Sequence, residues 1–156
     1  MIEISTPKSL EAAIKANLAE RQKKQPLLFE RILDSAAAGN LVARAPADFY
    51  VLHSSRFSYV EAKFSETAET LRSTFSNAVK SHQLASARLA ARAGGFYWIV
   101  FYSSISKRFE LWDGLYCANQ RSKGSPLAIV ERKLVTDQLD TVLDRILLTP
   151  KGASHG

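Results

Sequence analysis

Residues 47–63 read ADFYVLHSSRFSYVEAK, a pattern that predicts two β-strands joined by a short turn at residues 54–55. Successive side chains of a strand point to opposite faces, so Glu61 and Lys63 project from the same face of the second strand. If Asp48 enters the first strand, the antiparallel hairpin brings it back beside Glu61. Two carboxylates and one amine then meet, and this is the set of groups that a Mg2+ site acting on phosphate esters requires.

The length and composition of the chain fit one ordinary domain, because it has 156 residues of which 46% are hydrophobic. We expect a single domain over residues 1–150 and a disordered tail at residues 151–156. Cys117 is the only cysteine and cannot form an internal disulfide, and no basic and apolar leader opens the chain. We therefore expect a cytoplasmic protein. The longest apolar run, residues 96–102, is too short for a membrane helix of about 20 residues.

The formal charge of +6 is unevenly distributed along the chain. Residues 70–130 contain eight basic and two acidic residues, so they carry the whole excess, and the rest of the chain balances to zero. A basic half beside a small acidic cluster suits a polyanion that must approach a metal ion. A basic surface that only confers solubility explains the charge equally well, so charge alone does not separate these two readings.

The remaining pattern predicts helices around a sheet. Apolar residues at helical spacing predict four helices, at residues 6–24, 28–39, 81–93 and 136–149. Apolar runs between turn residues predict three further strands, at residues 96–102, 107–112 and 127–130. Residues 64–79 are expected to form a loop or a weak helix. The fold class is therefore α/β, with a mixed central β-sheet flanked by helices.

Several polar residues outside the hairpin have two readings. Glu30, in the second expected helix, belongs either to a solvated helix face or to the site as a further acidic ligand. Gln83, in the first turn of the helix at residues 81–93, is either an ordinary polar residue or a side chain that points towards the sheet. The basic residues expected to contact a phosphate backbone are Arg72, Lys80, Arg88 and Arg92.

Other common chemistries lack their motifs in this sequence. It has no glycine-rich phosphate loop, no Cys/His cluster and no GxSxG serine motif. We therefore expect no nucleotide cofactor and no zinc, and the acidic hairpin is the remaining candidate for chemistry.

Pro46, Asp48, Glu61 and Lys63 match the PD-(D/E)xK nuclease pattern, an acid that opens a hairpin followed by acid-x-Lys on the next strand. The run VEAK, then HQ at a helix start, then GGFYWIVFY resembles the RecU-type Holliday junction resolvases over about residues 45–114. This resemblance implies a restriction-endonuclease-like core. It further implies a homodimeric endonuclease, dependent on Mg2+ with Mn2+ as a substitute, that nicks four-way DNA junctions in pairs. The long stalk of that family is replaced here by a turn of a few residues.

The resemblance also implies roles for the residues that match. Asp48 and Glu61 would bind the metal together with the backbone carbonyl of Ala62. Lys63 would orient or deprotonate the attacking water, or neutralise charge in the transition state. Gln83 would position the water or the phosphate.

Two other functions stay open at this point. The same metal site could act on another DNA structure, in restriction, repair or flap cleavage. Alternatively, the chain could be a non-catalytic DNA-binding module on the same fold, although a pure binder has no need of clustered carboxylates that repel phosphate. No membrane partner is expected in either case.

Overall fold

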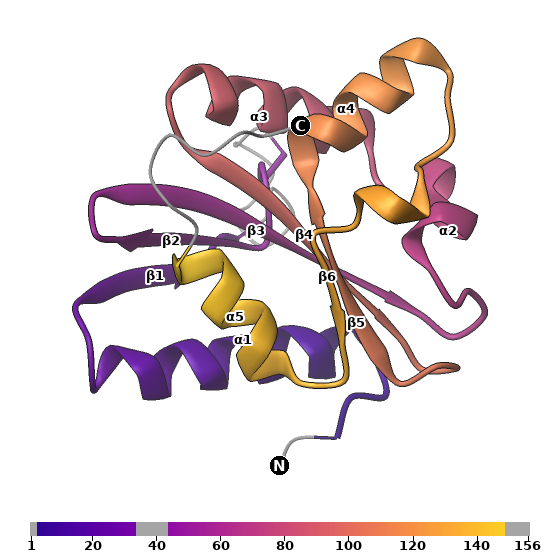
Figure 1. The fold of residues 1–156 in the computed structure, drawn as a ribbon. Coiled ribbons are helices and arrows are strands. Elements are labelled where there is room, and N and C mark those ends of the chain that lie inside the picture. Colours follow the sequence, from indigo (N-terminus) through magenta and orange to yellow (C-terminus); the bar gives the residue numbers. More distant parts are fainter. Residues whose placement is uncertain (1–2, 34–43, 149–156) are drawn as a thin grey trace.

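A computed structural model of the chain describes residues 3–33 and 44–148. Six strands form one sheet in the order β1-β2-β3-β4-β5-β6, and helices cover both of its faces (Figure 1). The pair β3 and β4 is parallel, and the other four neighbouring pairs are antiparallel. The mixed α/β architecture expected from the sequence is confirmed. The elements in chain order are α1 (Pro7–Gln22), β1 (Leu27–Arg31), β2 (Phe49–His53), β3 (Arg56–Ser65), α2 (Leu71–Ala78), α3 (Ser81–Arg92), β4 (Phe96–Ser103), β5 (Arg108–Asp113), α4 (Gly114–Lys123), β6 (Leu134–Thr136) and α5 (Leu139–Leu148).

The strands β2 and β3 form the predicted hairpin. Its turn consists of residues 54–55, two serines with φ of 52° and 62°, and two left-handed residues give a turn whose twist matches that of antiparallel strands. The register pairs Phe49 with Val60. Asp48, one residue before Phe49, therefore lies across from Glu61, and the hairpin alone brings the two carboxylates to the same place.

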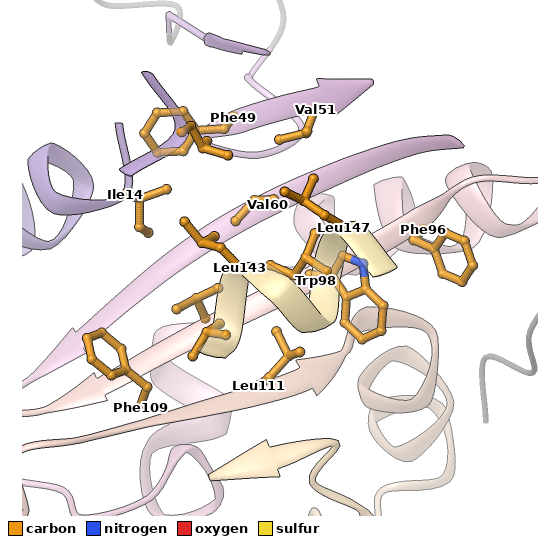
Figure 2. Close-up of a cluster of buried hydrophobic side chains, with 14 of the residues drawn as sticks. Ile14, Phe49, Val51, Val60, Phe96, Trp98, Phe109, Leu111, Leu143 and Leu147 are labelled. Carbon is orange, nitrogen blue, oxygen red and sulfur yellow. The ribbon is translucent and has the colours of Figure 1, made fainter. Parts of the chain in front are cut away.

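Two hydrophobic cores lie on opposite faces of the sheet. The first packs strands β2 to β5 against α1 and α5, and Figure 2 shows Val60 and Trp98 of the sheet beside Leu143 and Leu147 of α5. The second lies between the sheet and the helices α2, α3 and α4. All eight residues of β4 are buried, because this strand is covered on both faces, as its continuous apolar run predicted.

The helix α4 was not predicted, and it starts directly after β5. A Cβ added to Gly114 would lie 2.6 Å from Cδ1 of Tyr97, so this helix can approach β4 closely only with glycine at its first position. The Asp113 side chain caps the helix by accepting a hydrogen bond from the Leu115 N–H at 2.9 Å. The helix ends at Gly124, which has φ of 67°.

The prediction of a helix at residues 28–39 is wrong for the part of this segment that the structure describes, residues 28–33. Residues 27–31 form the edge strand β1, which pairs antiparallel with β2. A short apolar run fits the period of a helix and of a strand, and here the free edge of β2 supplies hydrogen bonds that decide for the strand. Its expected end at Gly39 lies outside the described residues, as does the expected tail.

Two smaller corrections concern the C-terminal half. The prediction of an edge strand at residues 127–130 is wrong. Ile129–Glu131 is a 3-10 helix, and the edge strand β6 follows it. Thr136 lies in β6, and the last helix starts three residues later at Leu139.

Residues 64–79, expected to form a loop or a weak helix, contain the end of β3 and the helix α2, which Thr70 caps. Within the described residues, no helix is long and apolar enough to cross a bilayer.

Candidate active site

A cleft of about 420 Å³ opens where the hairpin meets the N-terminus of α3. Two acidic side chains line it, those of Asp48 and Glu61, together with the amide of Gln83. Four side chains that carry or can accept positive charge complete the polar lining, those of Arg31, Arg44, Lys80 and His82. The cleft therefore combines a pair of carboxylates with a basic wall.

Asp48 is fixed by contacts on both of its oxygens. Its Oδ2 accepts a hydrogen bond of 2.8 Å from the backbone N–H of Ala62 in the opposite strand. Its Oδ1 lies 3.7 Å from Nη2 of Arg31, which belongs to β1. The neighbouring strands of the sheet thus hold this carboxylate beside the Glu61 position.

Glu61 is buried on β3, with 5% of its side chain exposed. Its Oε2 accepts a hydrogen bond from Nε2 of Gln83 at 2.9 Å and lies 2.8 Å from Nζ of Lys63. Burial, followed by the negative charge of Asp48, raises the pKa of Glu61 to about 7, and the Lys63 ammonium opposes this rise. A carboxyl group with this pKa lacks enough nearby positive charge to stay fully ionised at neutral pH.

This donor set fits a hard divalent cation. The negative charge of Asp48 makes the buried Glu61 costlier to ionise, and a cation between the two side chains removes that cost. Within residues 3–33 and 44–148, no group of three or more His, Cys, Asp or Glu side chains is arranged to hold a metal. Two carboxylates completed by water and by substrate oxygens are a usual arrangement for Mg2+, which keeps several of its waters. Asp48 and Glu61 are therefore the side chains that would hold such an ion.

Gln83 joins the helix α3 to the carboxylate pair. Its Oε1 accepts a hydrogen bond of 2.9 Å from the backbone N–H of Lys80, and its Nε2 donates to Glu61. The side chain is buried and both ends of its amide are occupied. In this arrangement Gln83 orients Glu61, and its expected contact with water or phosphate stays a prediction.

A third acid, Glu11, approaches from the other face of the sheet and was not predicted. Glu11 of α1 binds Arg31 of β1, with Oε2 at 3.1 Å from Nη2. Burial and the negative charge of Asp48 raise the pKa of Glu11, while Arg31 lowers it. Glu11 lies 37 positions before Asp48 in the sequence, in a helix with several other polar residues, so no local pattern marks it.

Glu30, the further acid expected from the sequence, lies elsewhere. It is exposed on β1 rather than on a helix and does not line the cleft. The reason is the wrong helical period assigned to this segment, which also hid Arg31 as a residue of the site.

The four predicted DNA contacts fall into different environments. Lys80 lines the cleft, whereas Arg72 of α2 and Arg92 at the end of α3 are exposed outside it. The guanidinium of Arg88 donates hydrogen bonds to the Ala118 carbonyl, at 2.7 Å, and to the Ser122 hydroxyl. Arg88 thus ties α3 to α4, and a DNA contact by any of these residues stays a prediction.

Comparison with known proteins shows a weak structural likeness. No protein-family model matches the chain, and no curated protein matches it. Among solved structures, the chain is similar to Hjc, a Holliday junction resolvase from the archaeal hyperthermophile Archaeoglobus fulgidus, with 11% sequence identity and a TM-score of 0.43. The match covers 67% of this chain and 78% of that chain. A likeness at this level gives no information about the activity of the present protein.

Proposed function

We propose that this chain is a metal-dependent endodeoxyribonuclease that uses Mg2+, with Mn2+ as a substitute, to nick four-way DNA junctions in pairs. The observation that carries the proposal is the meeting of Asp48 and Glu61 across the hairpin in a cleft with a basic wall. Lys63 does not line this cleft, but its ammonium lies 2.8 Å from Oε2 of Glu61. The match of these residues to the PD-(D/E)xK pattern supports the same reading. A site of this composition suits the hydrolysis of a phosphodiester.

The residues of the cleft have separable tasks in this proposal. Asp48 and Glu61, helped by the Ala62 carbonyl, would hold the ion, which supplies charge stabilisation at the phosphate and a more acidic bound water. Gln83 keeps Glu61 in position through its hydrogen bond. When the Glu61 charge is balanced by another cation, the Lys63 ammonium becomes free to hold a phosphate oxygen or the attacking water.

DNA is the proposed substrate because of the charge around the carboxylates. Arg31, Arg44 and Lys80 line the cleft, and such cations attract a phosphate backbone without reading its sequence. The preference for a four-way junction and the homodimer come from the resemblance in sequence to the RecU-type resolvases. Paired nicking of a symmetric junction requires two sites, which a two-fold dimer provides.

The proposal is tested by cleavage assays on a labelled mobile four-way junction, with and without Mg2+. We expect Asp48→Asn and Lys63→Ala each to reduce nicking by about a hundredfold or more, while binding of the junction survives. The matched control is Asp137→Asn, which removes an exposed carboxylate outside the cleft. Wild-type cleavage rates in Asp48→Asn or in Lys63→Ala would remove that residue from the mechanism.

The substrate class is tested on the same gels. A four-way junction, a flap and a linear duplex of equal length are compared at equal concentration, and we expect the junction to be nicked fastest. Preferred cleavage of the flap or the duplex would assign the site to repair or restriction instead. Light scattering of the protein with bound junction is expected to give the mass of a dimer, and a monomer would contradict paired nicking by one particle.

A further inference from the structure

We infer that a cavity on the α1 and α5 side of the sheet is a binding site for an organic cation with an apolar body. The cavity has a volume of about 530 Å³ and lies between α1, the start of α5 and the strands β4 and β5. It shares no described lining residue with the cleft that contains Asp48 and Glu61. The inference therefore does not rest on the proposed nuclease function.

The cavity exists because α1 carries small side chains at this place. Leu10 and Ile14 of α1 fill the core, whereas Ala13 and Ala16 line the cavity. Alanine reaches less far than leucine, so part of the sheet is left uncovered beside α5, which begins at Leu139. The helices α1 and α5 lie on the same side of the sheet (Figure 1), and the cavity opens between them.

Two aromatic residues of the sheet form the floor of the cavity. Tyr102 of β4 and Phe109 of β5 are paired across the two strands, and their ring centroids lie 4.8 Å apart. Both residues are buried, with exposed fractions of 8% and 3%, and both line the cavity. Ile4 and Leu139 add apolar surface. A cavity of this volume with an apolar lining is typical of sites for small organic molecules.

The hydroxyl of Tyr102 is a polar group without a partner in the protein. Among the described residues, no group donates a hydrogen bond to this hydroxyl or accepts one from it. The hydroxyl is not sealed in the core, unlike the indole N–H of Trp98 on the same strand, so it opens into the cavity that its side chain lines. A molecule in the cavity is needed to satisfy it.

The rim of the cavity is acidic, although the chain has a net charge of +6. Its carboxylates are those of Glu3, Glu20, Asp137 and Asp140, and Lys107 is the basic residue among the described lining residues. Carboxylates beside aromatic rings attract ammonium and guanidinium groups. A nucleic acid strand is excluded as the occupant, because its phosphates have the same sign of charge as the rim.

Two of these four carboxylates have no cation of their own. Glu20 and Asp140 already form ion pairs with basic residues of α1. Within the described residues, Glu3 and Asp137 form none. Asp137 accepts a hydrogen bond of 3.3 Å from the neutral Gln138 amide, which leaves its charge uncompensated. The ligand that matches the cavity therefore combines an ammonium or guanidinium group for the rim with a ring or aliphatic chain for the floor.

The inference is tested by NMR titration of the full chain with phenethylamine, in which two carbons join an ammonium group to an aromatic ring. We expect saturable shifts of the backbone amides of Ala13, Asn17 and Lys107. Phenylpropionate, which has a carboxylate in place of the ammonium, and neutral phenethyl alcohol are the matched probes. We expect the amine to bind about fivefold more tightly than either. Equal binding of the three probes, shifts without saturation, or shifts confined to the cleft at Glu61 would overturn the inference.

Variants of the rim are expected to act in opposite directions. We expect Asp137→Asn to weaken phenethylamine binding by about threefold, because it removes an unpaired carboxylate. We expect Lys107→Asn to strengthen binding by about the same factor, and asparagine tolerates the φ of 55° at this position. The control is Glu69→Gln, which removes an exposed carboxylate outside the cavity, next to the residue that caps α2. An equal effect in Glu69→Gln, or the same direction of change in both rim variants, would contradict the assignment.

Filling the cavity tests where the amine binds. Ala16 is exposed on α1 and lines the cavity, so Ala16→Phe places a ring in it without disturbing the core, and we expect saturable binding to be lost. Ala12→Phe, at an exposed position of α1 outside the cavity, is the matched control and is expected to leave binding unchanged. Tyr102→Phe removes only the hydroxyl and is expected to weaken binding by about threefold. Unchanged binding in Ala16→Phe, or equal loss in Ala12→Phe, would place the amine elsewhere and overturn the site.

Failure of this inference is distinguishable from failure of the proposed function. Cleavage of a junction by a protein without saturable amine binding would leave the nuclease proposal standing and remove the cation site. Saturable amine binding by a protein that cleaves no DNA would leave the cation site standing and remove the nuclease proposal.

Discussion

At the scale of single residues, Glu61 is the group whose chemistry depends most on its surroundings. The same acid-x-Lys tripeptide on an exposed strand would carry a fully ionised carboxylate. Here burial and the charge of Asp48 raise its pKa to about 7, although Lys63 lies 2.8 Å away. The site thus stores electrostatic repulsion that a bound cation relieves.

This repulsion predicts a pH dependence of stability. Unfolded Glu61 loses its proton near pH 4.5 and folded Glu61 near pH 7, so the folded state binds more protons between these values. The contribution of Glu61 to the free energy of unfolding therefore falls as the pH rises from about 4.5 to about 7 and then stays constant. We expect Glu61→Gln to remove this fall, so that the variant gains about 1–3 kcal/mol relative to wild type between pH 5 and pH 8.

Urea denaturation of both proteins at pH 5 and pH 8 measures that difference. Subtracting the free energy of unfolding of wild type from that of the variant at each pH cancels the contribution of the histidines, which both proteins share. Parallel changes of stability with pH in wild type and variant would show that Glu61 has an ordinary pKa. The same experiment in saturating Mg2+ is expected to flatten the wild-type curve, because a cation at the site favours the ionised form.

At the scale of elements, the β2–β3 turn sets the distance between Asp48 and Glu61. The turn is tight because Ser54 and Ser55 both adopt positive φ, which costs about 1 kcal/mol or more for a residue with a side chain. A one-residue change in the register would send Glu61 to the opposite face of the sheet. The geometry of the site therefore depends on a local turn.

The turn predicts a stabilising double substitution. We expect Ser54→Asn with Ser55→Gly to raise the free energy of unfolding by about 1 kcal/mol, because Asn-Gly adopts this turn most readily. Ser76→Gly, in the helix α2, is the matched control and is expected to lower stability by roughly 0.5–1 kcal/mol, since glycine is unfavourable inside a helix. Thermal or urea unfolding measures whether each variant is more or less stable than wild type. A destabilised turn variant would contradict the assigned turn.

A second element-scale feature is the buried carboxylate of Glu110 on β5, which holds α2 and the segment after α4. Its oxygens accept hydrogen bonds from the Thr70 hydroxyl at 2.9 Å and the Leu71 N–H at 2.8 Å. They also accept from Nε1 of Trp112 at 3.0 Å and lie 2.6 Å from Nη1 of Arg132. The network is fully satisfied, so we assign it to structure and not to catalysis.

We expect Glu110→Ala to lower the free energy of unfolding by about 3–5 kcal/mol, because it leaves Arg132 and the start of α2 without their partner. The exposed neighbour Glu131 gives the control, since Glu131→Ala is expected to change stability by less than about 0.5 kcal/mol. Urea denaturation measures both variants. A small effect in Glu110→Ala would show that α2 docks without the buried carboxylate.

At the scale of the whole molecule, the positive charge of +6 governs association with a polyanion. If about four phosphates are neutralised by the cleft and its surroundings, the affinity for DNA falls about a hundredfold between about 50 and 200 mM salt. Fluorescence anisotropy with a labelled junction at several salt concentrations measures the slope. A flat response would contradict the electrostatic argument and, with it, the choice of DNA as the substrate.

Much of the fold could be predicted from local patterns in this chain. The continuous apolar run of β4 and the alternation in β2 and β3 reflect burial that each strand needs in the sheet. The predictions failed at Leu27–Arg31 and before Leu134–Thr136, where short segments fit more than one period. They also missed α4, whose start depends on the close contact of Gly114 with Tyr97 in another strand.

The hairpin and, through it, the meeting of Asp48 and Glu61 follow from the amino-acid sequence, because side-chain alternation and a short turn are local properties. Which other groups join them depends on long-range packing. Glu11 and Arg31 arrive from α1 and β1, and Lys80 and His82 from α3, through packing of elements on a sheet. The pKa of Glu61 is likewise a tertiary property, since burial and a charge from another strand set it.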